Sequence, residues 1–310
     1  MWAREIPANL ARGFAMGCAD IVPGVSGGTV ALVLGVYRRL IDAIRTGSLA
    51  LGSFAKLDVR TGVERLKAVE WSLLLPLLAG ILTAILVLSH LIETLLEDRP
   101  VEMAGLFMGL VLGSVVIAWG LLENKGLRTL LLMLASAVVV FLLMGLTSGT
   151  SEESVTQAAD PTLLAFFGAG AIAICAMILP GISGSFLLVT MGMYGAVLSA
   201  VNDRDIAVVG VFALGCVLGL AVFSQLLHWA LSEHYDTVMA LLIGLMLGSL
   251  RVLWPWPGGV ESTELAAPAD PVAGPVLLAV GGFAVVILVE FVSRRLEGRT
   301  RSDEADELHV

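Results

Sequence analysis

Two copies of a Pro-Gly-x-Ser-Gly motif are the part of this chain whose residue types and spacing could do chemistry. One copy occupies residues 23–27 and the other occupies residues 180–184. Proline and glycine interrupt a helix, and the first N–H groups of the helix that restarts after them have no partner inside that helix. These N–H groups, the positive end of the helix dipole and the serine hydroxyl suit an anion, and phosphate above all.

Both motifs lie inside apolar runs, and this determines where the interruptions are expected. Residues 15–22 and 172–179 are too apolar for a surface turn, so we expect both interruptions at membrane depth. Backbone groups freed there have no lipid partner and must face protein, water or a ligand. A structural interpretation stays open, in which Ser26 and Ser183 cap their helices and the glycines allow close packing. The duplication and the depth favour a binding site.

Asp20 is a position at which the two copies differ in charge, because Met177 takes its place in the second copy. An ionisable residue inside a bilayer is by default a candidate functional residue. Its carboxylate would repel an anion unless it is protonated or paired with a cation, so a proton or a sodium ion could act through it. The alternative is that Asp20 accepts hydrogen bonds from the N–H groups of its own interruption. Both interpretations stay open.

The similarity between the two parts of the chain extends well beyond the motifs. Residues 15–37 and 172–194 share Cys18/Cys175, Pro23/Pro180, Gly35/Gly192 and Tyr37/Tyr194, each pair 157 positions apart. Farther along, the spacing falls to 135 positions in the pairs Gly80/Gly215, Gly109/Gly244, Ser114/Ser249 and Trp119/Trp254. The chain is therefore an internal duplication whose first half carries 22 additional residues in a basic connection.

The composition is that of a polytopic membrane protein. Hydrophobic residues make up 57% and charged residues 15% of the chain, with a mean hydropathy of +0.93, whereas soluble domains have about 45–50% apolar and about 25% charged residues. The acidic residues behind the net charge of −9 cluster in loops, and no basic face for nucleic acid is visible. The three cysteines lack the spacing of a disulfide framework or a metal site, so we expect no cofactor. The sequence contains neither a Walker loop nor a nucleophile with a nearby histidine, so nothing in it supports an enzyme.

The apolar runs predict an all-α fold of two halves, each a re-entrant helical hairpin followed by three membrane spans. Each hairpin arm of about 14 residues would rise about 21 Å and stop short of crossing a ~30 Å hydrocarbon core; a single kinked span is the competing interpretation. The first half (1–147) is expected to contain a hairpin at 6–45, a cytoplasmic connection at 46–70 with a short amphipathic helix, and spans at 71–95, 103–121 and 127–147. An external loop at 148–161 precedes the second half (162–292), with a hairpin at 162–200, spans at 206–231, 236–254 and 273–292, and a cytoplasmic tail at 293–310.

The distribution of basic residues predicts the orientation. Arginines flank the first hairpin and follow the last span, whereas the connections 148–161 and 255–272 contain neither lysine nor arginine. By the positive-inside rule both termini then lie in the cytoplasm. A hairpin plus three spans gives an odd number of crossings, so the halves would be inverted relative to each other, as in many secondary transporters. Arg12 and Arg38, beside the first hairpin, could meet a lipid phosphate, although most such arginines only orient a protein.

The segment GFAMGCADIVPGVSGGT, together with the second PGISGS, resembles the polyprenyl-phosphate transporter family, long catalogued only as a domain of unknown function. The resemblance covers essentially the whole chain. It implies transport of undecaprenyl phosphate from the outer to the inner leaflet of the bacterial cytoplasmic membrane, which recycles the carrier lipid of cell-envelope synthesis. The residues that carry it are Asp20, Pro23, Gly24, Ser26, Gly27, Gly28, Thr29, Pro180, Gly181, Ser183 and Gly184. Ser185 stands where the first copy has Gly28, so the two copies need not contribute equally.

The motif chemistry and the resemblance lead to the same hypothesis, a lipid-phosphate transporter. A phosphate headgroup would be dehydrated at paired helix ends while its chain stays among the membrane lipids, and the two halves would rock around it. We expect the substrate site to comprise the residues just named together with Ser185, Arg12 and Arg38. The alternative is an ion-coupled transporter of a small soluble anion, which the same site would serve. The sequence predicts no particular oligomeric state.

Overall fold

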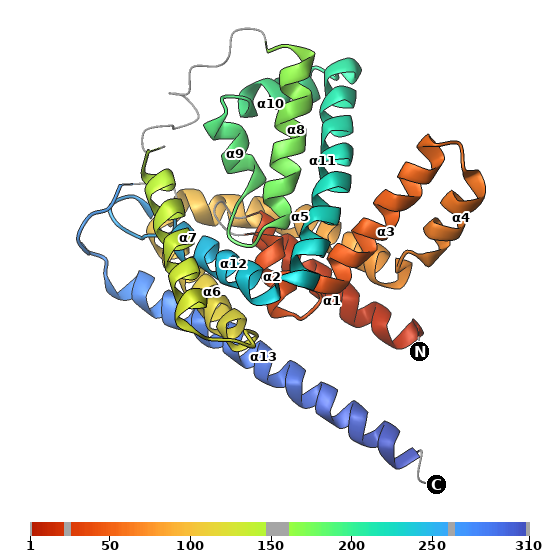
Figure 1. Cartoon of the computed structure of the whole chain (residues 1–310). Coiled ribbons are helices and arrows are strands. Elements are labelled where there is room, and N and C mark those ends of the chain that lie inside the picture. Colours follow the sequence, from red (N-terminus) through yellow and green to blue (C-terminus); the bar gives the residue numbers. More distant parts are fainter. Residues whose placement is uncertain (1, 22–25, 147–160, 260–263, 308–310) are drawn as a thin grey trace.

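The structure, a computed structural model, describes residues 2–21, 26–146, 161–259 and 264–307, and within these ranges all regular secondary structure is helical (Figure 1). The helices of the first half are α1 (Trp2–Asp20), α2 (Gly27–Val33), α3 (Tyr37–Ala55), α4 (Val59–Ala68), α5 (Trp71–Asp98), α6 (Pro100–Gly120) and α7 (Leu127–Leu146). Those of the second half are α8 (Leu163–Ile178), α9 (Gly184–Thr190), α10 (Tyr194–Asn202), α11 (Ile206–Glu233), α12 (Tyr235–Ser249) and α13 (Ala273–Glu307).

Among the described residues, five helices are long and apolar enough to cross a membrane. They are α5, α6, α7, α11 and α13, with apolar windows at Trp71–Leu88, Pro100–Gly120, Leu127–Gly145, Ile206–Glu233 and Ala273–Phe291. The helices α8 and α12 are equally apolar in character but shorter. Exposed leucines and valines cover the long helices, for example Leu86 at 83% and Leu277 at 70% exposure. Such surfaces are stable in lipid, and the chain is a polytopic membrane protein.

The helix at the expected span 236–254 is shorter than predicted. The α-helix α12 ends at Ser249, and the chain then continues through tighter turns in which each N–H bonds the carbonyl three residues back, as far as Trp254. Pro255 explains the end of these turns, because the residue before a proline avoids the helical region. The regular helix therefore has only 15 residues.

The connection predicted at 46–70 with one short helix is also wrong in detail. The helix α3 runs on to Ala55 and is followed by a second helix, α4, so that the segment forms a helical hairpin. Leu57 makes the turn with a φ of 60°, and Asp58 caps α4 by accepting a hydrogen bond from the Thr61 N–H at 3.1 Å. Figure 1 shows this hairpin projecting from the bundle. It contains the residues by which the first half exceeds the second.

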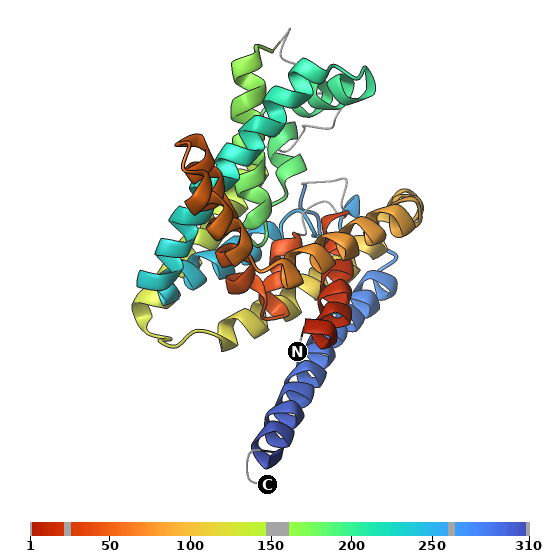
Figure 2. The ribbon, with the colours of Figure 1, turned by 90° about the vertical axis from the view of Figure 1, so that its right-hand side faces the viewer.

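The last predicted span, 273–292, lies within α13, whose apolar window is Ala273–Phe291. The helix α13 continues without a break from Ala273 to Glu307, so the described part of 293–310 is helical. Figure 2 shows this helix leaving the bundle toward the C-terminus.

Both halves contain a second interruption that the sequence prediction placed inside a hairpin arm. The helices α2 and α9 have only 7 residues each, and each is followed two residues later by a glycine, Gly35 or Gly192, with a φ of +69° or +66°. In each case the next N–H, of Val36 or Met193, bonds a carbonyl five residues back. This is a Schellman ending, which requires a left-handed residue and therefore favours glycine. The second arm of each hairpin, expected to have about 14 residues, is thus interrupted after 7.

Packing contacts recur between the halves at equivalent positions. A Cβ on Gly80 of α5 would collide with the Leu10 carbonyl of α1, and a Cβ on Gly215 of α11 would collide with the Phe167 carbonyl of α8. Gly80 and Gly215 are 135 positions apart, and Leu10 and Phe167 are 157 positions apart, which are the spacings of the sequence repeat. The first long helix of each half is therefore packed against its own half in the same way.

The last helix of each half packs on the other half. A Cβ on Gly109 of α6 would collide with the Ala279 carbonyl of α13, and a Cβ on Gly244 of α12 would collide with the Met133 carbonyl of α7. Figure 1 shows the resulting pairs, α6 with α13 and α7 with α12. Small residues allow this close approach of backbones, which is how membrane helices gain packing energy without a hydrophobic driving force. The two halves are thereby joined at two helix pairs.

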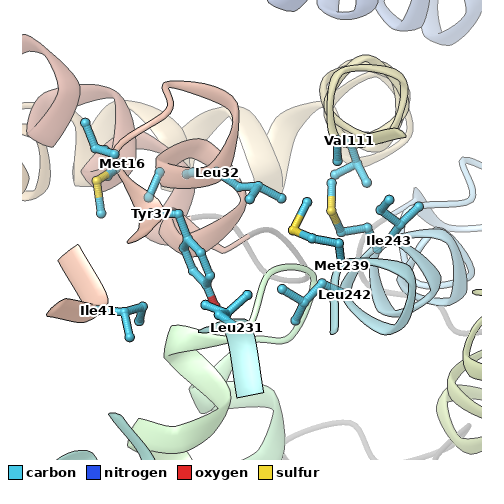
Figure 3. Packing of buried hydrophobic residues seen from close by; sticks show 14 of the residues in the cluster. Met16, Leu32, Tyr37, Ile41, Val111, Leu231, Met239, Leu242 and Ile243 are labelled. Carbon is cyan, nitrogen blue, oxygen red and sulfur yellow. The ribbon is translucent and has the colours of Figure 1, made fainter. Parts of the chain in front are cut away.

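The core lies where the two halves meet. Its buried side chains come from α1, α2 and α3 of the first half and from α11 and α12 of the second (Figure 3). They include Met16, Leu32, Tyr37, Ile41, Leu231, Met239, Leu242 and Ile243. Val111 of α6 completes the labelled group. The motif residues lie beside this core, so the interior packing of the protein determines their positions.

Candidate functional site

The two Pro-Gly-x-Ser-Gly segments contact each other through backbone and side-chain hydrogen bonds. The Ser26 hydroxyl donates to the Met177 carbonyl at 3.2 Å, and the Gly181 N–H donates to the Thr29 hydroxyl oxygen at 3.0 Å. The Tyr37 hydroxyl donates to the Ile178 carbonyl at 3.1 Å. Carbonyls freed at the end of α8 are thus satisfied by side chains of the first half. Residues more than 140 positions apart in sequence form one junction.

At the start of α2 the first N–H groups are occupied by the chain itself. Ser26 is the N-cap residue, and its hydroxyl accepts from the Gly28 N–H at 3.1 Å while its carbonyl accepts from the Thr29 N–H at 2.9 Å. The Gly27 N–H donates to Oδ1 of Asp20 at 2.6 Å. Asp20 is exposed, whereas Ser26 and Thr29 are each only 2% exposed. The carboxylate of Asp20 therefore occupies the place at which an external anion would meet this helix end.

The glycines of the first motif are required by close contacts. A Cβ on Gly27 would lie 2.6 Å from Oδ2 of Asp20, and a Cβ on Gly28 would lie 2.7 Å from the carbonyl oxygen of Ile178. Gly181 of the second motif has a φ of +85° and lies against the backbone of Met246 in α12. A larger residue at any of these positions would separate the two segments or strain the turn.

The second motif has the same arrangement without the carboxylate. Ser183 is the N-cap residue of α9, although its side chain does not cap the helix. A Cβ on Gly184 would lie 2.5 Å from the Met177 side chain, just as a Cβ on Gly27 would contact Asp20. Met177 therefore takes the place of Asp20 in space as well as in sequence. The second motif therefore has a thioether where the first has a carboxylate.

Three of the predicted site residues cannot be placed in this geometry. Pro23 and Gly24 lie outside the described residues, and so does the side chain of Ser185. Pro180 is buried within the turn between α8 and α9. Within the described ranges, no group of three or more His, Cys, Asp or Glu side chains is placed to hold a metal ion.

The two predicted arginines make their described contacts elsewhere. Arg12 donates to Oδ1 of Asn9 at 2.8 Å, and Asn9 is fully buried and donates to the Ser72 carbonyl at 3.0 Å. Arg38 donates to the Leu231 carbonyl in the last turn of α11 at 3.2 Å, and its guanidinium lies 4.3 Å from the centre of the Tyr235 ring. A cation is stabilised at a helix C-terminus and over an aromatic face. Arg38 thus joins α3 to α11 and α12, whereas Arg12 supports Asn9, which joins α1 to α5. None of these contacts involves the described residues of either motif.

Sequence reasoning missed Tyr37 as part of the junction. Its ring is 2% exposed, and Figure 3 shows it reaching from the first half toward the segment that precedes α9. Burial removes the hydroxyl from water, so its bond to the Ile178 carbonyl has no competitor. The sequence repeat did contain a signal for this residue, because Tyr37 matches Tyr194. A tyrosine at a helix end, however, does not by itself indicate which group it binds.

Comparison with known proteins adds independent information. Residues 16–267 match the model of a family described as VCA0040-like, undecaprenyl phosphate translocase-like. The chain is 41% identical over 245 residues to a polyprenyl-phosphate transporter of Vibrio cholerae serotype O1, covering 79% of this chain and 76% of that protein. It is 31% identical over 257 residues to a polyprenyl-phosphate transporter of Staphylococcus aureus, covering 80% of this chain and 86% of that protein. No solved structure gives a significant match.

Proposed function

Because the chain belongs to the VCA0040-like family of undecaprenyl phosphate translocase-like proteins, we propose that it transports polyprenyl phosphate between the leaflets of the cytoplasmic membrane. Undecaprenyl phosphate is the proposed substrate, and outer to inner leaflet is the proposed direction. Transport moves the lipid without making or breaking a covalent bond, so the proposed role is not enzymatic. The observation that supports it most is the junction of the two interrupted helices.

The proposed position of the phosphate is the N-terminus of α9. A phosphate that leaves water needs hydrogen bonds to replace those it loses, since an unpaired charge in an apolar interior is costly. The backbone N–H groups of Gly184 and Ser185 lie at the start of α9, and Met177 does not compete there as a carboxylate would. The Pro180-Gly181 turn fixes the direction of this helix end through the hydrogen bond from Gly181 to Thr29.

The proposed role of Asp20 is to exchange with the substrate. Its carboxylate holds the Gly27 N–H, and binding of a proton or a sodium ion to this carboxylate would weaken that hydrogen bond. When Asp20 binds a cation or moves away, the Gly27 N–H at the start of α2 becomes available as a second donor for the phosphate. When the phosphate leaves, the carboxylate returns. Such an exchange couples the state of Asp20 to the presence of the substrate.

We further propose that each half is a re-entrant segment plus three spans, and that the halves are inverted relative to each other. Seven residues of helix rise about 11 Å, so α2 and α9 are too short to complete a crossing of a ~30 Å core. The recurrence of equivalent glycine contacts, Gly80 with Leu10 and Gly215 with Phe167, supports a common plan for both halves. Inverted halves around a central substrate are typical of transporters that alternate access by rocking.

Cysteine labelling tests the proposed orientation, in which both termini are cytoplasmic. Position 57 is the best reporter for the basic hairpin, because Leu57 is 87% exposed. Position 203, in the exposed turn after α10, reports the other side. In a background without Cys18, Cys175 and Cys216, Asp203→Cys should react with an impermeant maleimide added outside cells, and Leu57→Cys should react only after permeabilisation. The reverse pattern would show the opposite orientation, and equal access at both positions would remove the inverted-repeat proposal.

A reconstituted transport assay tests the function itself. The purified protein in proteoliposomes should move a fluorescent polyprenyl phosphate between leaflets, whereas the matching polyprenol, which lacks the phosphate, should not be moved faster than in empty vesicles. Uptake of inorganic phosphate serves as the second arm. Uptake of inorganic phosphate without movement of the lipid would replace the proposed function by transport of a small soluble anion. Inactivity in both arms would contradict both functions.

A further inference from the structure

A groove with apolar walls lies between α8, α9 and α11, next to the second motif. We infer that it holds the first isoprenoid units of the substrate chain while the phosphate is at the junction of the motifs. The inference rests on the proposed function and names where the lipid part of that substrate lies. The groove has a volume of about 410 Å³, within the range of about 300–1,000 Å³ found for ligand pockets. Its walls include Ala171, Cys175, Leu179, Ile182, Val222 and Phe223.

The chemistry of the walls selects a hydrocarbon. All the lining residues are apolar or small, and none carries a charge. The one thiol, of Cys175, is directed at the Gly219 carbonyl at 3.7 Å, so its weak donor is used within the wall. Nothing in the groove could replace the water lost by an anion or a sugar. A branched, unsaturated hydrocarbon chain needs no such replacement.

The groove lies directly beside the proposed phosphate site. Leu179 and Ile182 line the groove on either side of Pro180-Gly181. Backbone atoms within the same turn bind the first half, through the Ile178 carbonyl with Tyr37 and the Gly181 N–H with Thr29. Ser183 follows directly after Ile182. A chain attached to a phosphate at the N-terminus of α9 therefore meets the groove at its first carbons.

The repeat shows why this groove belongs to the second half. The residues equivalent to Ala171 and Gly219 are Phe14 on α1 and Ala84 on α5, which are larger in both cases. Ala84 is fully buried and lies against Gly17, so the corresponding α1–α5 surface is closed at this level. The internal anion Asp20 is also in the first half. The lack of an Asp20 equivalent favours the second half for the phosphate. The smaller residues at 171 and 219 favour the same half for the isoprenoid chain.

The groove is expected to orient the chain more than to attract it. Lipid tails are as apolar as the groove, so moving the chain from lipid into the groove gains little hydrophobic energy. Its contribution is to hold the first isoprenoid units beside the turn, so that the headgroup enters the junction. Blocking it should slow transport while the protein remains folded, because the blocked surface faces lipid.

Two substitutions and a photoreactive substrate test the inference. Ala171→Phe places the first half's own residue in the groove, and Val222→Trp fills its mouth, where Val222 is 68% exposed. Leu214→Trp is the matched control, because Leu214 is an exposed residue of the same helix outside the groove. We expect both groove variants to move polyprenyl phosphate about tenfold more slowly, equivalent to about 1.4 kcal/mol, and the control to match the wild type.

Photolabelling provides a readout that does not depend on transport. A polyprenyl phosphate with a diazirine in its first isoprenoid unit, added to the wild type in phosphatidylglycerol nanodiscs, should label the groove walls around 171–182 and 222–226. The same diazirine on a polyprenol should label them much less. Unchanged transport in both groove variants, labels outside these walls, or equal labelling by the polyprenol would each overturn the inference while leaving the proposed function intact. A wild type that moves no lipid phosphate but is labelled would instead contradict the proposed function.

Discussion

Replacement of Gly28 by alanine is expected to slow the transport of polyprenyl phosphate by about tenfold or more. The added methyl group would lie 2.7 Å from the carbonyl oxygen of Ile178, which already accepts a hydrogen bond from Tyr37. Overpacking of this kind costs about 1–3 kcal/mol. The start of α2 and the turn before α9 would have to move apart. The donor groups that the phosphate needs from the two segments would then also move apart. Movement of fluorescent polyprenyl phosphate in proteoliposomes measures the effect.

Gly168→Ala is the matched control for this substitution. Gly168 is also a membrane-embedded glycine, on α8, but no atom lies within 4 Å of the methyl group that alanine would add. It should transport at the wild-type rate. If Gly28→Ala proves unstable, Thr29→Val provides the same test without added bulk, because it removes only the hydroxyl that accepts from the Gly181 N–H. Normal transport by a folded Gly28→Ala and by Thr29→Val would show that the junction is not the site.

Asp20→Asn is expected to remove the dependence of transport on an ion gradient. The amide oxygen of asparagine can still accept from the Gly27 N–H, so the start of α2 should keep its geometry. Asparagine cannot bind or release a proton and is a poor partner for sodium. If Asp20 exchanges with the phosphate as proposed, the variant should bind lipid phosphate and move it at a rate that no imposed proton or sodium gradient changes.

The comparison with Asp20→Ala separates this role from simple capping. Loss of a capping side chain costs about 0.5–2 kcal/mol, so a cap alone predicts that alanine lowers the thermal stability and that neither variant changes the gradient dependence. The exchange predicts that both variants lose the gradient dependence, whatever their stability. Proteoliposomes with imposed proton or sodium gradients, each variant beside the wild type, distinguish these outcomes. An Asp20→Asn variant with wild-type rates and an unchanged gradient response would leave Asp20 a structural residue.

The amino-acid sequence determined the class of the protein, its duplication and the residues of the motifs. Long apolar runs have few solutions in a membrane, because every backbone group in lipid must be paired within its own segment, and helices satisfy this requirement. The spans at 71–95 and 206–231 therefore fall within α5 and α11, the span at 103–121 matches α6 up to Gly120, and the described part of 127–147 lies in α7. The duplication needed only the recurrence of the same residue types at constant spacing. Gly35 and Gly192, which follow the ends of α2 and α9, also match in the sequence repeat, although the repeat did not indicate their left-handed conformation.

Only the tertiary structure decided which partners the site residues have. Nothing local indicates that Tyr37 binds the Ile178 carbonyl or that Arg38 binds the end of α11. For Asp20 the sequence left two interpretations open, and the structure shows its carboxylate accepting from the Gly27 N–H of its own interruption. The exchange of α7 and α13 between the halves was equally hidden, since their contact residues Met133 and Ala279 are 146 positions apart, a spacing that the sequence comparison did not reveal. Hydrophobic periodicity indicates a helix and its apolar face, but an apolar face is equally stable against lipid and against another helix. The periodicity therefore does not indicate which helices pair. Which helices pair is decided by the close fit of small residues against distant backbones, and that fit exists only in the folded protein.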